Sequence, residues 1–261
     1  MRDGTFIPKL LNRVTRMQYV PSPDRDRDRF LAEHYTGAGW KDLSSAAKQA
    51  WVDLREVLAK VKVQTIAYVG AHEGEVALGM NQIFPRKKFY LIEPAPETFK
   101  KLVENVSPWQ NMKCLNLGAG AQEEELDIFV DNFSAASSLL PYLEKATQEF
   151  PFLGKTHTSR IKVKPLDQIL QGCGAEEIDM LIMDVQGYED KVLQGATLTL
   201  RSCKIIISEL SLQPLYESSS TFDSVYGRMV REGFYLRHLL NPIKGINQTI
   251  LQIDGVFVRE S

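Results

Sequence analysis

The chain lacks the long apolar run that a membrane-spanning helix needs. No stretch of the sequence approaches the ~20 consecutive apolar residues that cross a bilayer. The first residues, MRDGTFIPKLLNR, also lack the apolar segment of a secretory signal peptide. These absences predict a soluble, cytoplasmic protein with no membrane span.

Cysteine and net charge are scarce too. The three cysteines, Cys114, Cys173 and Cys203, are odd in number, far apart and in no metal-binding spacing, which predicts reduced and mostly buried thiols. A net charge of -2 gives no general basic field, so sequence-independent binding of nucleic acid is not expected. The three cations Arg86–Lys88 are either a local basic patch for nucleic acid or a solvated turn.

Apolar residues are plentiful enough for one large core. At 261 residues and 44% apolar, the chain is expected to form a single α/β domain over residues 63–261, after an N-terminal helical extension over residues 1–62. Apolar residues from Asp42 to Val61 recur on one helical face, which predicts a helix docked on the sheet. Residues before about Gly39 are either a solvated surface segment or a lid.

The stretch Thr65–Glu75, TIAYVGAHEGE, predicts a buried strand, a glycine turn and then a helix. Gly70 allows the backbone to turn sharply, Ala71 keeps the turn slim, and Gly74 lets the helix start close to the strand or to a ligand. Such a turn directs backbone N–H groups and a helix N-terminus towards a polar small molecule. A plain strand-to-helix turn, with glycines that serve packing alone, is the alternative.

The glycine spacing argues against a dinucleotide. The dinucleotide fingerprint needs a further glycine where this chain has His72. The next predicted strand, Lys88–Ile92, ends in Glu93, about 20 residues beyond the turn, where a carboxylate can accept hydrogen bonds from both hydroxyls of a ribose. A nucleoside without a pyrophosphate points to S-adenosylmethionine.

A second small-residue segment follows the third predicted strand, Met112–Leu117. Gly118-Ala119-Gly120 is expected to be a turn at the carboxyl edge of the sheet, either beside the adenine or simply leading into the next element. The residues that we predict to contact the cofactor are Tyr68, Gly70, Ala71, His72, Glu73, Gly74, Glu93, Pro94, Gly118, Ala119 and Asp184.

Two acidic residues follow mostly apolar runs that suit central parallel strands. Asp184 follows Ile178–Met183, and Glu209 follows Cys203–Ile207. At adjacent strand ends, Asp184 is the first candidate for the base or for a group that orients the acceptor, although it could instead cap the following turn. Asp184 and Glu209 could alternatively bind Mg²⁺. His72 is either a third catalytic candidate or a hydrogen-bonded turn residue.

The rest of the chain alternates strands and helices and ends in a hairpin. Alternation predicts strands at Glu125–Val130 and Arg160–Lys164, and the long segment between them, residues 131–159, is expected to be an insertion that faces the acceptor. Phe234–Leu240 and Thr249–Val258 have no helix between them, which predicts an antiparallel hairpin. This pattern matches the mixed, mostly parallel seven-stranded sheet of Rossmann-like class I methyltransferases.

Ordered motifs resemble one family. The chain is similar to the FkbM family of S-adenosylmethionine-dependent methyltransferases in the segments VGAHEG, LIEP, SSLL, PLDQIL, IDMLIMDVQGYE, VLQGA and IIISEL. The family turn usually reads Asp-Val-Gly-Ala-Asn-x-Gly, and here Tyr68 takes the Asp position and His72 the Asn position. By this resemblance the carboxylate that commonly holds the methionine amino group is missing, and Glu73 or water would replace it. Ile182 and Gln186 stand where many members carry Lys and Glu.

The resemblance implies an O-methyltransferase. Its acceptor would be a hydroxyl of a small metabolite, natural product, sugar or lipid-linked molecule. Three other interpretations are a methyltransferase-like protein that binds cofactor without turnover, a nicotinamide oxidoreductase and a nucleic-acid methyltransferase. A homodimer is possible on the sequence alone.

Overall fold

A computed structural model describes residues 61–83, 86–175 and 177–259. Its main sheet has seven strands in the order β3-β2-β1-β7-β8-β10-β9, and only β10 runs antiparallel to its neighbours. The strands are β1 (Thr65–Val69), β2 (Lys88–Ile92), β3 (Met112–Leu115), β7 (Met180–Met183), β8 (Ile205–Ser211), β9 (Phe234–Lys244) and β10 (Ile250–Arg259). The predicted mostly parallel sheet with a terminal antiparallel hairpin is confirmed.

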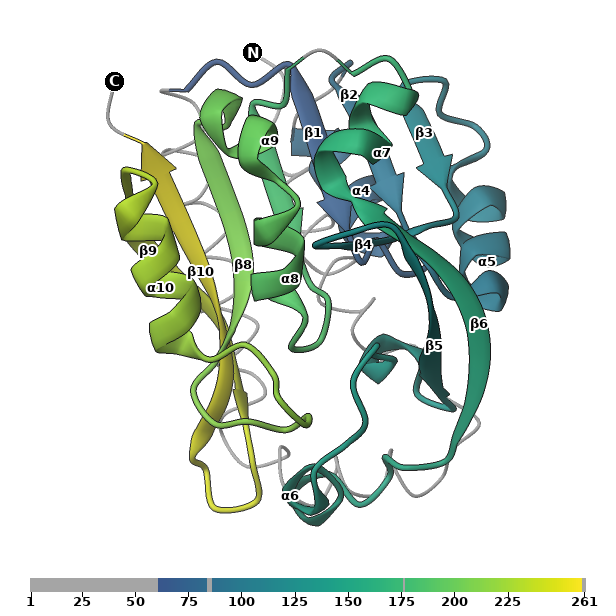
Figure 1. Cartoon of the computed structure of the whole chain (residues 1–261), viewed down its shortest axis with the longest axis vertical. Helices are drawn as coiled ribbons and strands as arrows, with labels where there is room; N and C mark the ends of the chain where they lie inside the picture. The colour runs from purple at the N-terminus through teal and green to yellow at the C-terminus, as the bar shows by residue number, and fades with distance from the viewer. Residues whose placement is uncertain (1–60, 84–85, 176, 260–261) are drawn as a thin grey trace, which may run out of the picture.

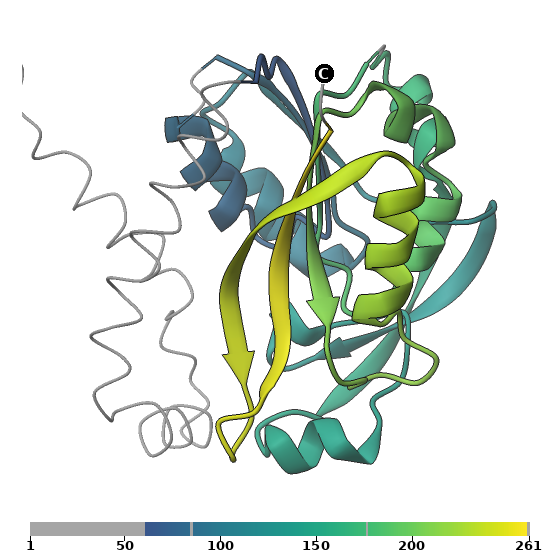
Figure 2. The same ribbon diagram turned by 90° about the vertical axis from the view of Figure 1, so that its left-hand side faces the viewer.

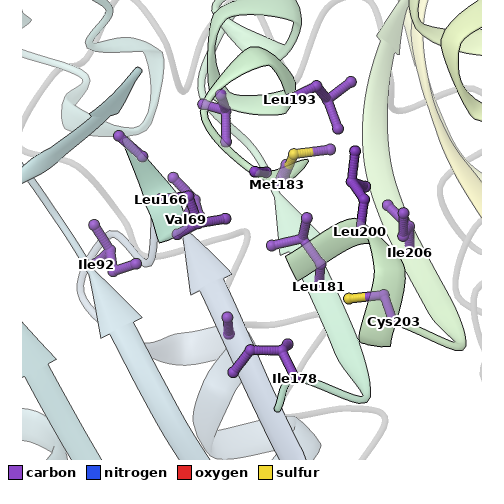
Figure 3. Packing of buried hydrophobic residues seen from close by; sticks show 14 of the residues in the cluster. Val69, Ile92, Leu166, Ile178, Leu181, Met183, Leu193, Leu200, Cys203 and Ile206 are labelled. Atoms are coloured by element: carbon purple, nitrogen blue, oxygen red, sulfur yellow. The ribbon is translucent and has the colours of Figure 1, made fainter. Parts of the chain in front are cut away.

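Helices cover both faces of this sheet (Figures 1 and 2). They are α4 (Glu75–Ile83), α5 (Pro96–Val106), α7 (Leu166–Gly172), α8 (Glu189–Gln194), α9 (Thr197–Ser202) and α10 (Phe222–Arg231). On one face Leu193 and Leu200 pack against Leu181 and Ile206 (Figure 3), and on the other Met80 and Leu102 join a second buried cluster. Burial on both faces explains why the central strands are mostly apolar.

A second, three-stranded sheet lies beside the main one, which the sequence did not predict. Its order is β4-β6-β5, with β4 at Gly118–Gly120, β5 at Glu124–Asp131 and β6 at Thr156–Pro165. The segment between β5 and β6 contains a short 3₁₀ helix, η1 (Ser134–Ala136), and α6 (Glu144–Glu149). The two strands predicted around the insertion are therefore present, but outside the main sheet.

The prediction of a turn at Gly118-Ala119-Gly120 is wrong, because these residues form β4 and pair in parallel with β6. Their small size is a packing requirement. A Cβ atom at Gly118 would lie 2.9 Å from Val163 Cγ2, and one at Gly120 would lie 2.6 Å from Val163 Cγ1. Three small residues show no strand periodicity, so the pairing with β6 was hidden in the sequence.

The order of the main sheet reverses between β1 and β7. From β1 the chain proceeds to β2 and β3 on one side, and the later strands are added on the other. Ligands of open α/β sheets bind outside the carboxyl ends of the strands at such a switch point. The loops that follow β1 and β7 are therefore where a ligand is expected.

Some sequence predictions fall outside the described residues. These are the helix predicted at Asp42–Val61, the surface segment or lid before it, and nearly all of the extension over residues 1–62. Within the part of the chain that the structure describes, no helix is long and apolar enough to cross a membrane.

Candidate functional site

The turn after β1 is hydrogen-bonded to both neighbouring strands. The N–H groups of Gly70 and Ala71 donate to the Ile92 carbonyl at 2.9 and 3.0 Å, and the N–H of Asp184 donates to the Val69 carbonyl at 3.0 Å. The N–H groups of Gly70 and Ala71 are thus already paired within the fold. These hydrogen bonds hold the turn in place, and a ligand beside it would need other donors.

The two glycines of the turn serve close packing. Gly70 has φ +78°, and a Cβ atom there would lie 1.8 Å from the backbone oxygen of Asp184. Gly74 has φ +91°, and a Cβ atom there would lie 2.9 Å from Leu102 Cδ1 on α5. Gly70 therefore brings β1 and β7 together at the switch point, and Gly74 lets α4 begin against α5.

Glu93 is a buried carboxylate at the end of β2. Its side chain accepts hydrogen bonds from the N–H groups of His72, at 3.0 Å, and Ala95, at 2.9 Å. Burial raises the pKa of Glu93 to about 7, against the lowering effect of these two bonds. A carboxylate that is only 6% exposed, and that pairs with no lysine or arginine among the described residues, can accept further hydroxyl donors, which fits the ribose of a nucleoside.

His72 connects three parts of the site. Its Nδ1 lies 3.3 Å from Glu75 Oε2, its Nε2 lies 2.8 Å from Ser134 Oγ, and its backbone φ is +49°. Burial opposes protonation of the ring, but the bond to Glu75 and the charges of Glu75 and Glu93 outweigh it and raise the pKa of His72. The predicted hydrogen-bonded turn histidine is present, and its ring is directed at the insertion.

Asp184 lies at the carboxyl end of β7 and is exposed to solvent. Its Oδ1 accepts a hydrogen bond of 2.6 Å from the Gln186 side-chain amide, and the Gln186 Oε1 accepts one of 2.8 Å from the Tyr216 hydroxyl. Protein atoms around the carboxylate reduce its hydration and raise the pKa of Asp184, while Gln186 and His72 lower it. The arrangement offers a fixed, accessible carboxylate to an incoming hydroxyl.

Glu209 lies in the adjacent strand, β8, as predicted, but inside the strand and not at its end. It is 5% exposed, and its Oε2 accepts a hydrogen bond of 2.7 Å from Gln252. Burial raises the pKa of Glu209 well above its usual value, and the charges of Asp184, Glu189 and Asp254 raise it further. Unlike Asp184, Glu209 is thus suited to hold a proton within the core.

The predicted magnesium site at Asp184 and Glu209 stays a prediction. Among residues 61–83, 86–175 and 177–259, no group of three or more His, Cys, Asp or Glu side chains is arranged to hold a metal ion. Two carboxylates with water ligands would be the whole protein contribution to such a site.

Not every residue that was predicted to contact the cofactor lies with Glu93, His72 and Asp184. Glu73, the proposed replacement for the missing carboxylate, pairs with Lys101 of α5 at 2.7 Å. The Tyr68 ring packs in the apolar cluster beneath α4 and α5, and Ala119 is buried in the cluster on the opposite face. The backbone oxygens of Glu93 and Pro94 both accept from the Asn116 side chain, at 2.8 and 3.1 Å, which fixes the chain after β2.

The structure also adds residues that sequence reasoning did not select. Ser134, Ser138 and Tyr216 reach the two strand-end loops from distant parts of the chain. The only sequence signal was the SSLL motif, which includes Ser138 but neither Ser134 nor Tyr216.

Replacing Glu189 by glutamine should reduce the pH dependence of folding stability. Glu189 is 2% exposed, and burial raises its pKa to about 7 in the folded state. As pH rises from about 5 to 8, an unfolded glutamate ionises before the folded one does, so the folded state loses stability, by up to roughly 3 kcal/mol for this group. The glutamine of E189Q keeps an oxygen for the N–H of Gly187, which bonds Glu189 Oε1 at 3.2 Å, but it does not titrate.

Urea unfolding at pH 5 and pH 8 measures this effect. The loss of stability between the two pH values should be smaller by a few kcal/mol in E189Q than in the unaltered chain. The matched control is E104Q, at an exposed glutamate of α5, which should leave the loss unchanged. Equal losses in E189Q and the unaltered chain would contradict the assignment.

Comparisons with known proteins agree with the family resemblance. The model of the methyltransferase FkbM domain matches residues 69–236, more than half of the chain. The 2-O-methyltransferase NoeI of Sinorhizobium fredii is 25% identical over 155 residues, which cover 57% of this chain and 64% of that protein. The chain thus spans a little under two thirds of the length of this relative.

The chain is also similar to solved structures, at low identity and with TM-scores below 0.5. Fibrillarin of Aeropyrum pernix with bound S-adenosyl-L-methionine is 15% identical, with a TM-score of 0.45 over 76% of this chain and 67% of that chain. TrmK of M. capricolum in complex with S-adenosyl-homocysteine is 8% identical, with a TM-score of 0.45 over 79% of this chain and 68% of that chain.

Proposed function

The chain belongs to the FkbM family of S-adenosylmethionine-dependent methyltransferases, and we propose that it methylates a hydroxyl of a small acceptor. The observation that carries this proposal is the exposed carboxylate of Asp184, held by Gln186 at the switch point of the sheet. NoeI is named a 2-O-methyltransferase, which supports an oxygen as the atom methylated.

The cofactor would lie across the ends of β2, β1 and β7. Glu93 would accept hydrogen bonds from the ribose, and Asn116 would keep the chain after β2 in place beside it. When bound, S-adenosylmethionine supplies a methyl group on a positively charged sulfur. The Asp184 carboxylate would face that charge and orient the acceptor hydroxyl, and it would take the hydroxyl proton as the oxygen attacks the methyl carbon.

A methyltransferase-like binding protein is the second candidate. It is favoured by the replacement of the usual carboxylate by Tyr68 and by the pairing of Glu73 with Lys101, since together they leave the methionine amino group without an obvious partner. Binding of S-adenosylhomocysteine without turnover on any hydroxylated acceptor would support it.

Replacing Glu93 by alanine is expected to weaken S-adenosylhomocysteine binding by about 10- to 100-fold. The reason is the loss of hydrogen bonds between ribose hydroxyls and a charged acceptor, which contribute about 1.5–3 kcal/mol. Because ribose donors favour the ionised form and the pKa of Glu93 is about 7, binding to the unaltered chain should also tighten from pH 6 to pH 8.

Calorimetry with S-adenosylhomocysteine, and with NAD as the negative control, measures both effects. The matched variant is E97A, because Glu97 lies four residues further on, is largely exposed and pairs with Lys100. E97A should bind as the unaltered chain does. Equal affinity of E93A would overturn the ribose assignment, and the same titrations with Mg²⁺ or EDTA would show whether a metal takes part.

A further inference from the structure

Five residues after β5 cross the switch point and touch the loops on both sides of it. We call this segment, Ser134–Ser138, the strap. At one end Ser134 bonds His72 in the loop after β1, 62 residues away in sequence, and at the other Ser138 bonds Gln186 in the loop after β7, 48 residues away. β1 and β7 are paired neighbours, so the strap connects the two strand ends between which a ligand is expected.

The end of the strap at Ser138 is held by several interactions. The Ser138 hydroxyl donates to the Gln186 carbonyl at 2.8 Å, and the Ser138 backbone exchanges two hydrogen bonds with Phe129 of β5. The Tyr142 hydroxyl donates to the Ala136 carbonyl at 2.9 Å, and its ring stacks 5.1 Å from the ring of Tyr216. The single hydroxyl hydrogen of Tyr216 is shared between the Ala136 carbonyl, at 3.0 Å, and Gln186 Oε1, at 2.8 Å. This end is therefore a fixed anchor.

The end at Ser134 depends on fewer contacts. Within the described part of the chain, the side-chain hydrogen bond that ties Ser134 to a distant element is the bond to His72. Glu75 accepts from Nδ1, so the neutral ring receives the Ser134 hydrogen at Nε2, and a protonated ring donates to the same oxygen. A serine hydroxyl serves in both states, so this contact persists when His72 changes its protonation.

His72 also contacts the residue that we predict to bind the ribose. Its backbone N–H donates to Glu93 Oε2, the oxygen that a ribose hydroxyl would also approach. A ligand that donates to this oxygen would share its acceptor with the residue that holds Ser134.

We propose that the Ser134–His72 contact is a releasable catch, and that the strap swings about its anchor at Ser138 to admit the cofactor and then closes over it. The inference rests on the proposed function, since it takes the cofactor site to lie beneath the strap. The two ends of the strap differ as a gate requires. The end at Ser138 is fixed to Gln186, and the end at Ser134 has a releasable contact with His72. Opening breaks the Ser134–His72 bond and leaves the pairing of β1 with β7 unchanged, while Phe133, just before the strap, keeps its contact with the Phe152 ring.

The test compares S134A with S134T in the full chain by hydrogen exchange and by the kinetics of S-adenosylhomocysteine binding. Without ligand, S134A should raise amide exchange in residues 134–137 about tenfold, because one hydrogen bond is lost, and S134T should restore the original rate. S137A is the matched control, since Ser137 Oγ accepts from the N–H of Asp131 at the end of β5 and not from the loops after β1 and β7, and it should leave the binding rates unchanged.

Binding rates distinguish a gate from a direct contact. A gate predicts that S134A raises the association and dissociation rates together by several-fold and leaves Kd within about twofold. Unchanged exchange and unchanged rates in S134A would overturn the inference, as would a change in Kd with an unchanged association rate. If the unaltered chain binds no S-adenosylhomocysteine, the proposed function fails, and the exchange rates alone decide whether the catch exists.

Discussion

Replacing Gly70 by alanine is expected to destabilise the fold by about 3–5 kcal/mol, the largest effect that we predict for a single methyl group. Gly70 has φ +78°, and the added Cβ atom would lie 1.8 Å from the backbone oxygen and 2.8 Å from the backbone carbon of Asp184. Both are main-chain atoms at the end of β7 that no rotamer change can move. The variant can fold only if β1 and β7 separate at the switch point, which also disturbs the position of Asp184.

Gly174 provides the matched control for this variant. It has nearly the same backbone angle, φ +77°, but a Cβ atom there would meet no heavy atom within 4 Å. G174A should therefore show only the cost of a left-handed backbone, about 1 kcal/mol. Urea unfolding followed by circular dichroism measures both variants. A loss in G70A no greater than that in G174A would mean that the two strands are not locked together at this glycine.

The local sequence pattern was sufficient to predict the position of a residue whose surroundings are set by its own strand. Asp184 and Glu209 were predicted to lie on adjacent parallel strands, because each follows a mostly apolar run, and β7 and β8 do pair in that way. Glu93 was found by its position at the end of the strand after the glycine turn. In each case the residue and its signal lie within a few positions of each other in the chain.

Contacts between distant segments were not predictable in the same way. Gly118-Ala119-Gly120 was interpreted as a turn because nothing in three small residues indicates a pairing with Val163 and its neighbours. Glu73 was assigned to the cofactor by its place in the motif, but its partner is Lys101, 28 residues away on α5. The strap joins His72 to Ser134 and Gln186 to Ser138, and neither pairing leaves a periodic signal.

Gln186 shows what such long-range contacts add to the active-site proposal. The family resemblance marked it only as a departure, since many members carry glutamate there. In the structure the side-chain N–H of Gln186 donates to Asp184, and the side-chain oxygen Oε1 accepts from Tyr216. The orientation of the side-chain amide is therefore fixed from both sides. A glutamate would place a second acceptor against Asp184, and the glutamine instead holds the carboxylate in place.

The matched control for the reaction itself is Asp254 of β10. This carboxyl group accepts a hydrogen bond of 2.8 Å from Asn241, and burial raises its pKa to about 7. The charge of Asp184 also raises the pKa of Asp254, so the two groups interact, but Asp254 lies on the antiparallel strand β10 and not at the carboxyl end of a parallel strand. D254N should change turnover by less than about tenfold, because it removes a nearby charge and no group that we place beside the acceptor.

Replacing Asp184 by asparagine is expected to lower turnover by a factor of about 100 to 10,000, the usual contribution of a positioned base. The asparagine of D184N can still accept from Gln186 through its side-chain oxygen, so the loop should keep its shape, but it can neither take the acceptor proton nor face the sulfur with a negative charge. S-adenosylhomocysteine, which carries no positive charge on sulfur, should bind with nearly unchanged affinity. Turnover measured on the first hydroxylated acceptor that a screen identifies, beside calorimetry of the same variant, separates the two quantities. If D184N retained full turnover, Asp184 would be removed from the mechanism, and Glu209 or His72 would become the next group to test.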